Sequence, residues 1–173
     1  VRRFFAAPVC YSPFFRDIPL AFLDFVVKHP KSAQKLPAFL PHLMDYECLE
    51  LKVEIAPDVD EARRKSSGDV LRNRLCVPAS SQLAHYPYPV TRITPKWQPK
   101  KEQAQFVLVY RTSNDAVETL ELNALSAHLF ALLQSQQCAG QTALKQLAQH
   151  LQQPVADLQP HACTLLEEWQ HLG

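Results

Sequence analysis

The sequence predicts an α+β protein in which a helical N-terminal part precedes a small winged-helix-like domain. Two runs have strand character and are separated by a polar turn. The run at 106–111 is rich in Val, Leu and Tyr, and the run at 116–122 contains Val, Thr and Leu. Three amphipathic stretches follow between 123 and 173. Apolar segments punctuated by prolines occupy 1–57. The C-terminal order of elements is therefore β-β-α-α-α.

Composition limits the class of protein. The chain has 173 residues, is 47% hydrophobic and carries a formal net charge of +1, which predicts a folded core and excludes a strongly basic nucleic-acid protein by bulk charge alone. It contains no apolar run long enough to span a membrane. Five scattered cysteines without a C-x-x-C pair indicate reduced thiols in a cytoplasmic protein.

The N-terminal part is expected to be helical. A short helix is predicted within 2–10, and Pro19 suits the first turn of a helix that reaches Val27 and ends before Pro30. The next segment, 36–55, has two competing periods. Its first half has leucines at helical spacing, whereas 49–55 alternates strictly, which by itself predicts a strand. No turn signal separates the halves, so we favour one continuing helix and leave the strand open.

A polar, charged stretch at 58–69 is the best candidate for a linker. It divides a helical domain at 1–57 from an α+β domain at 70–173. Within the second domain, 71–77 is expected to form a short strand, although its pattern does not decide whether it joins the sheet. Prolines in 86–93 predict an extended conformation, because each restricts the residue before it.

The three C-terminal helices have clear boundaries and faces. Asn123 is a favoured N-cap residue, and Asp157 is well placed to begin the last helix. Apolar residues recur at helical spacing along all three stretches and can close a small bundle against the two strands: Leu125, Leu129, Leu132, Leu133, Leu144, Leu147, Leu151, Leu165, Leu166 and Trp169.

Motifs for catalysis and for metal or phosphate binding are absent from the sequence. No G-x-S-x-G or H-E-x-x-H motif occurs, the seven histidines do not have metal-ligand spacing, and the three glycines are isolated. We therefore expect no catalytic residues, no metal site and no cofactor, and a protein that is not an enzyme.

Charge distinguishes two polymers that a winged-helix-like domain can bind. Residues 112–173 contain one lysine, Lys145, and six acidic residues, giving a formal net charge of −5. Duplex DNA would be repelled by such a surface. Basic residues gather earlier in the chain and form either a polyanion or partner surface or a solvated loop edge: Arg63, Arg64, Lys65, Arg92, Lys96, Lys100 and Lys101.

An extended peptide requires no basic charge, because it adds as a strand to an open sheet edge and places alternate side chains in an apolar groove. The candidate walls of such a groove lie on the second predicted strand and the last predicted helix: Val117, Thr119, Leu120, Leu165, Leu166 and Trp169. The alternative is that these residues are core.

The chain resembles a known family at these positions. Glu118-Thr-Leu-Glu-Leu-Asn123, the helix after it and the ending Leu165-Leu-Glu-Glu-Trp-Gln-His-Leu172 resemble PqqD-like domains, which recognise leader peptides of ribosomally made, modified peptides. Ser12-Pro-Phe-Phe-Arg-Asp-Ile-Pro and Leu36-Pro-Ala-Phe-Leu-Pro-His-Leu-Met-Asp-Tyr-Glu47 resemble the N-terminal domain of the HvfC/BufC family.

The resemblance implies a non-catalytic accessory, or chaperone, protein. Members of the family are partners of a multinuclear iron oxygenase with a TIM-barrel fold and present a precursor peptide to it, and the iron ligands belong to the oxygenase. The N-terminal domain of the family has also been labelled putatively DNA-binding, which keeps a DNA-binding transcriptional regulator as the alternative. Because the family has further helices upstream, and because this chain starts at Val1 and has only Met44, we expect the N-terminal domain to be incomplete.

Overall fold

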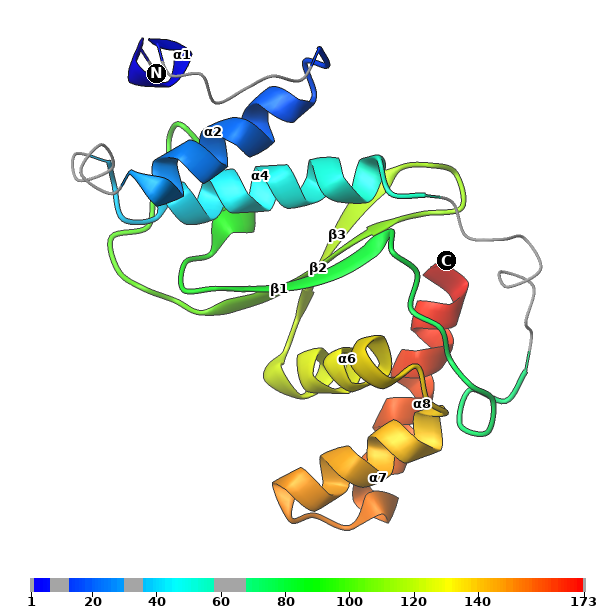
Figure 1. The fold of residues 1–173 in the computed structure, drawn as a ribbon. Helices are drawn as coiled ribbons and strands as arrows, with labels where there is room; N and C mark the ends of the chain where they lie inside the picture. Colours follow the sequence, from blue (N-terminus) through cyan, green and yellow to red (C-terminus); the bar gives the residue numbers. More distant parts are fainter. Residues whose placement is uncertain (1, 7–12, 30–35, 58–67, 173) are drawn as a thin grey trace. The chain divides into compact units, whose positions relative to one another are not determined.

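The computed structural model describes residues 2–6, 13–29, 36–57 and 68–172. Most of the expected linker lies outside the described residues. The helices and strands are α1 (Arg2–Ala6), α2 (Asp17–Lys28), α4 (Leu40–Glu54), β1 (Ser81–Tyr86), η1 (Val90–Arg92), β2 (Gln105–Arg111), β3 (Val117–Leu122), α6 (Ala124–Gln136), α7 (Gly140–Leu151) and α8 (Val155–Leu172). Figure 1 labels all of them except η1.

Packing divides the chain into two compact units. The first unit comprises 1–52 together with 86–105, and the second comprises 53–85 together with 106–173. The segment between β1 and β2 therefore packs with the N-terminal helices, although it lies within the expected C-terminal domain in sequence. The expected domains, 1–57 and 70–173, are regions expected to fold independently of one another. Packing units do not test independent folding, so these domain boundaries stay a prediction.

The helices of the first unit follow the sequence closely. α2 begins at Asp17, which puts Pro19 in its first turn as predicted, and it ends where the His29 N–H donates to the Phe25 carbonyl. Phe4 of α1 packs edge to face on Phe25, with ring centroids 5.7 Å apart. Phe4 and Phe25 are both buried.

α4 settles the two competing periods in favour of the continuing helix. It is unbroken from Leu40 to Glu54, so the alternating stretch 49–55 is not a strand. Tyr46, Cys48 and Val53 are buried along it. An alternating pattern over seven residues is too short to outweigh a helix that is already under way with no turn signal to stop it.

The expectation of an extended chain at 86–93 is wrong in part. Tyr86 ends β1, but Val90–Arg92 forms the 3-10 turn η1. Pro89 before it has φ −76°. A proline restricts the residue that precedes it while its own φ is compatible with a helical turn, so the chain turns after the proline.

The described residues form one sheet of three strands, in the order β1-β2-β3. β2 and β3 are antiparallel, with the register running from Phe106 opposite Leu122 to Arg111 opposite Val117, which confirms both predicted strands. β1 was not predicted, because its sequence Ser-Gln-Leu-Ala-His-Tyr lacks both clear alternation and β-branched residues.

The expected strand at 71–77 is wrong. Asp69 begins a turn whose carbonyl accepts from the Asn73 N–H at 2.9 Å, and Arg74 then forms an isolated bridge with Ala139. Leu71 and other apolar residues of this stretch pack against the helical core, so their hydrophobicity reflects core packing rather than sheet pairing.

The helix boundaries in the second unit agree with the sequence at Asn123 and differ at the last helix. The Asn123 side chain accepts a hydrogen bond from the Ser126 N–H at 2.9 Å and caps α6 as predicted. α8 begins at Val155, so Asp157 is not its first residue but lies in its first turn, where its charge favours the helix dipole. The Asp157 N–H donates to the Pro154 carbonyl, which starts the helix earlier.

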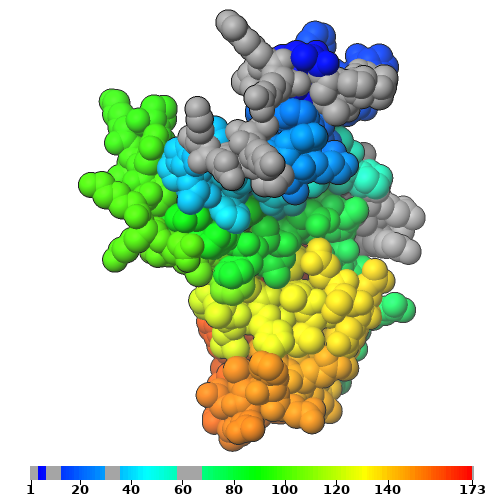
Figure 2. Space-filling view, turned by 60° about the vertical axis from the view of Figure 1, so that its left-hand side comes forward, coloured from blue at the N-terminus to red at the C-terminus, as the bar shows by residue number. Residues whose placement is uncertain are grey.

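Two apolar clusters hold the second unit together. α6 packs on α7 and on β3, and α7 packs on α8. The first cluster joins the three helices through buried leucines such as Leu129, Leu144 and Leu166. The second cluster places α6 and α8 against one face of the sheet, around Leu108 and Phe130. Figure 2 shows the side chains of α6 (yellow) and α7 (orange) in continuous contact. The unit is a winged-helix-like α+β fold.

Candidate functional site

β3 lies at an edge of the sheet, and among the described residues it pairs only with β2. The hairpin before it is closed by a three-residue loop. The Thr112 N–H donates to the Ala116 carbonyl at 2.8 Å, and the Asp115 N–H donates to the Thr112 carbonyl at 3.0 Å. Asp115 has φ 62°, the left-handed conformation that this type of hairpin loop requires.

This loop determines which backbone groups of β3 face outward. Hydrogen-bonded and non-bonded pairs alternate along an antiparallel ladder. Since Thr112 bonds to Ala116, the next bonded pair is Tyr110 with Glu118. The Arg111 N–H confirms the alternation, because it donates away from β3 to the Ser80 carbonyl at 2.9 Å. Val117 and every second residue after it therefore direct their N–H and C=O groups away from β2.

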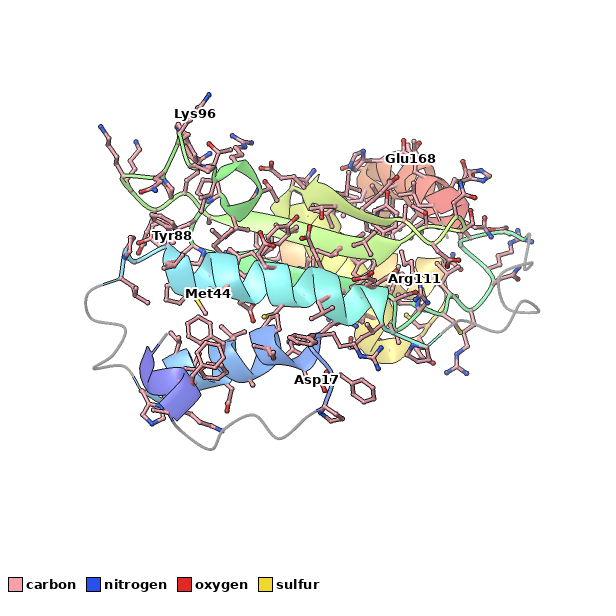
Figure 3. The ribbon with its side chains drawn as sticks, turned by 90° about the horizontal axis from the view of Figure 1, so that it is seen from above. Asp17, Met44, Tyr88, Lys96, Arg111 and Glu168 are labelled. Atoms are coloured by element: carbon pink, nitrogen blue, oxygen red, sulfur yellow. The ribbon has the colours of Figure 1, made fainter. Side chains whose placement is uncertain are left out.

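α8 supplies an apolar wall beside this edge. Leu120 and Leu122 of β3 belong to the same apolar cluster as Trp169 and Leu172 of α8. Trp169 packs edge to face on Phe130 of α6, with ring centroids 5.3 Å apart. Figure 3 shows α8 (red) next to β3 (yellow-green), with Glu168 on the outer side of the helix. The geometry combines an edge strand with an adjacent helix face.

The six candidate wall residues do not all share this location. Leu120 and Trp169 lie together in the cluster at the edge, whereas Leu166 is only 3% exposed and is part of the helical core. Leu165 lines a small apolar hollow between α6, α7 and α8. Because side chains alternate along a strand, Val117 and Thr119 lie on the opposite face of the sheet from Leu120.

Two residues at the edge were missed by sequence reasoning. Glu118 accepts a hydrogen bond from the Tyr110 hydroxyl at 2.8 Å, across the two strands. Burial raises the pKa of Tyr110 to about 12, with a further contribution from the bond to Glu118 and from its charge. Leu172 was missed although it continues the spacing of Leu165 and Trp169, which is the signal that would have found it.

The electrostatics of the edge are negative. Glu118 on β3 and Glu167 and Glu168 on α8 are exposed. In the sequence from 112 to 173, Lys145 is the only lysine or arginine, and it lies on α7. The field along β3 and α8 therefore attracts cations and repels anions such as nucleic-acid phosphates.

The candidate basic surface belongs in part to the first unit. Lys96, Lys100 and Lys101 are exposed and line an open hollow with Trp97, which is 46% exposed. Arg92 is on η1, before this loop. Three further candidates, at 63–65, lie outside the described residues.

Possible metal ligands are not gathered at one place in the part of the chain that the structure describes. His128 and His150 lie edge to face at 4.8 Å, yet the described residues include no group of three possible metal ligands. Cys48 is buried, and burial raises the pKa of its thiol. Four of the five cysteines are described, and all four are free.

The second unit thus has a winged-helix-like architecture, with the edge strand β3 beside its last helix. The model of the HvfC C-terminal domain matches residues 78–170, just over half of the chain. The chain belongs to the HvfC family. A search of curated proteins finds no match to it. Among the described helices, none combines the length and apolar character needed to cross a bilayer.

Proposed function

We propose that the protein is a non-catalytic accessory protein that binds the leader of a ribosomal precursor peptide and presents the precursor to an iron-dependent oxygenase of TIM-barrel fold. The observation that supports this most is the edge strand β3, whose outward backbone groups run beside the apolar cluster of Leu120 and Trp169. Membership in the HvfC family supports an accessory role.

In this proposal the leader lies along β3 as a fourth strand. Its backbone exchanges hydrogen bonds with the outward-facing N–H and C=O groups of Val117, which supplies affinity for any extended sequence. Every second leader side chain then points to the same face of the sheet as Leu120, where an apolar residue can cover Trp169. The chemistry takes place in the partner, so this chain contributes binding and orientation.

The alternative, a DNA-binding transcriptional regulator, would require a basic surface. The exposed lysines around Trp97 are the described residues that favour it. The last helix opposes it, because α8 carries three acidic residues and no lysine or arginine. A helix of this charge would be repelled by the phosphates that flank a groove of duplex DNA.

Co-purification tests the proposal. The chain is tagged and co-expressed with an oxygenase and with short open reading frames encoded beside its gene, and the purified material is analysed by mass spectrometry. We expect the oxygenase and one short precursor to be retained, and less of the precursor to be retained by a Val117→Pro variant, in which an outward N–H is removed. Submicromolar, sequence-specific binding of duplex DNA at about 0.15 M salt would contradict the proposal.

A further inference from the structure

Resting on the proposed function, we infer that the peptide segment that adds to β3 is cationic and amphipathic. It carries an apolar side chain beside Leu120, a basic side chain two positions away beside Glu118, and further basic residues facing Glu168. The proposal concerns the chemical class of the ligand, whereas strand addition alone would accept any extended sequence.

The spacing of the peptide side chains follows from the pleat of the sheet. A residue on an added strand has its side chain next to the β3 residue it pairs with, on the same face. Leu120 and Glu118 are two residues apart and therefore share the face that α8 covers. The apolar peptide residue contacts Leu120 and Trp169, and its neighbour on that face meets the carboxylate of Glu118.

The charges at this edge favour a basic occupant. The Tyr110 hydroxyl is a neutral donor, so its 2.8 Å bond to Glu118 leaves the negative charge of the carboxylate in place. Glu168 and Glu167 add exposed negative charge on α8. The nearest arginine along the chain, Arg111, pairs with Val117 and so lies on the opposite face of the sheet from Glu118, and its Nη1 donates to the Glu54 carbonyl at 2.7 Å.

The same charges disfavour a second copy of this chain as the occupant. Pairing of β3 with β3 of another copy would gather the exposed Glu118 side chains of both strands on one face of the seam and the exposed Glu121 side chains on the other face. Like charges on adjacent strands are destabilising, and charged residues on an edge strand are a common protection against self-pairing. An acidic peptide and a nucleic acid are repelled for the same reason.

Three synthetic peptides test the inference. They are about ten residues long, share one frame of alternating valine and threonine, and carry lysine, glutamine or glutamate at the same three positions. Binding is measured by fluorescence anisotropy at low and at high salt. We expect the lysine peptide to bind about tenfold more tightly than the glutamine peptide, and the glutamate peptide to bind most weakly. High salt should reduce the difference.

A double variant, Glu118→Gln with Glu168→Gln, should remove most of the advantage of the lysine peptide over the glutamine peptide. Asp157→Asn is the control for a loss of charge away from the edge, because Asp157 lies at the opposite end of α8 from Glu168. Circular dichroism checks that each variant folds.

The possible outcomes separate the two levels of the proposal. Equal binding of all three peptides would overturn the inference about charge and leave strand addition standing. Absence of binding for all three would count against the proposed function as well. Concentration-dependent self-association through β3, seen by sedimentation and abolished by Val117→Pro, would show that a second copy occupies the edge and would also overturn the inference.

Discussion

The hydroxyl of Tyr110 on β2 donates to the carboxylate of Glu118 on β3 at 2.8 Å. The two residues are directly opposite in the register of the hairpin. Tyr110 is buried and Glu118 is exposed, so the bond joins a residue of the core to an acidic residue of the edge strand.

The stability of the protein should fall at alkaline pH because of Tyr110. Its pKa is about 12 in the folded protein and about 10 in an unfolded chain. Because the pKa is higher in the folded protein, the contribution of Tyr110 to the free energy of unfolding is fully present below pH about 10 and is lost as the pH rises toward about 12. Urea unfolding across this range should show that the free energy of unfolding declines less steeply with pH for Tyr110→Phe than for the unmutated protein. Near neutral pH the substitution should lower the free energy of unfolding by about 1 kcal/mol. A decline identical to that of the unmutated protein would contradict this assignment.

Gly140 should not tolerate a side chain. A Cβ at this position would lie 2.4 Å from the Val70 carbonyl oxygen and 2.7 Å from Leu166 Cδ1. Backbone cannot move aside cheaply, so Gly140→Ala should lower the free energy of unfolding by about 1–3 kcal/mol. Gly68→Ala is the matched control, because a Cβ there meets the movable end of the Asn73 side chain. If thermal unfolding shows that both variants lose the same free energy of unfolding, the close packing of Val70 and Leu166 around Gly140 does not limit the residue at this position.

Trp169 should tolerate phenylalanine better than alanine. Its Nε1 is buried and has no hydrogen-bond partner among the described residues, so Trp169→Phe removes a polar group without breaking a recorded bond. The smaller ring can keep its edge-to-face contact with Phe130. We expect Trp169→Phe to change the free energy of unfolding by less than about 1.5 kcal/mol and Trp169→Ala to lower it by about 3 kcal/mol. Similar losses in chemical denaturation would show that the indole N–H has a partner.

Val117→Pro should weaken peptide binding without unfolding the sheet. The N–H of Val117 points away from β2, and proline is tolerated on an edge strand at its first residue. Loss of one backbone hydrogen bond should reduce affinity for the lysine peptide about five- to tenfold. Val117→Thr keeps both the N–H and the branched side chain and should bind as the unmutated protein does. A melting temperature unchanged by proline together with unchanged affinity would place the peptide elsewhere.

The sequence was sufficient for elements with a strong local signal. The α6 cap at Asn123 and the two strands of the hairpin were predicted because capping residues and apolar alternation act over a few positions. β1 escaped prediction because tertiary pairing with β2 stabilises a segment with weak strand propensity. Residues 71–77 were misassigned because a short apolar run has the same composition whether it pairs in a sheet or packs on helices.

The candidate site was predictable only in part. Leu120 and Trp169 were identified because each belongs to an apolar pattern within one element. The pairing of Tyr110 with Glu118 depends on the register of the hairpin, which is set by the left-handed conformation of Asp115. Contacts that depend on such a register are set by backbone geometry over several residues, and composition alone does not reveal them.

Backbone amide hydrogen exchange along β3, measured with and without the lysine peptide, tests the central claim most directly. Amides of β3 that already bond to β2, such as that of Glu118, should exchange at the same rate in both states. We predict that the amide of Val117, which points away from β2, exchanges more slowly when the peptide is bound, because a fourth strand accepts its hydrogen bond. Unchanged exchange of the Val117 amide under saturating peptide would contradict strand addition at β3.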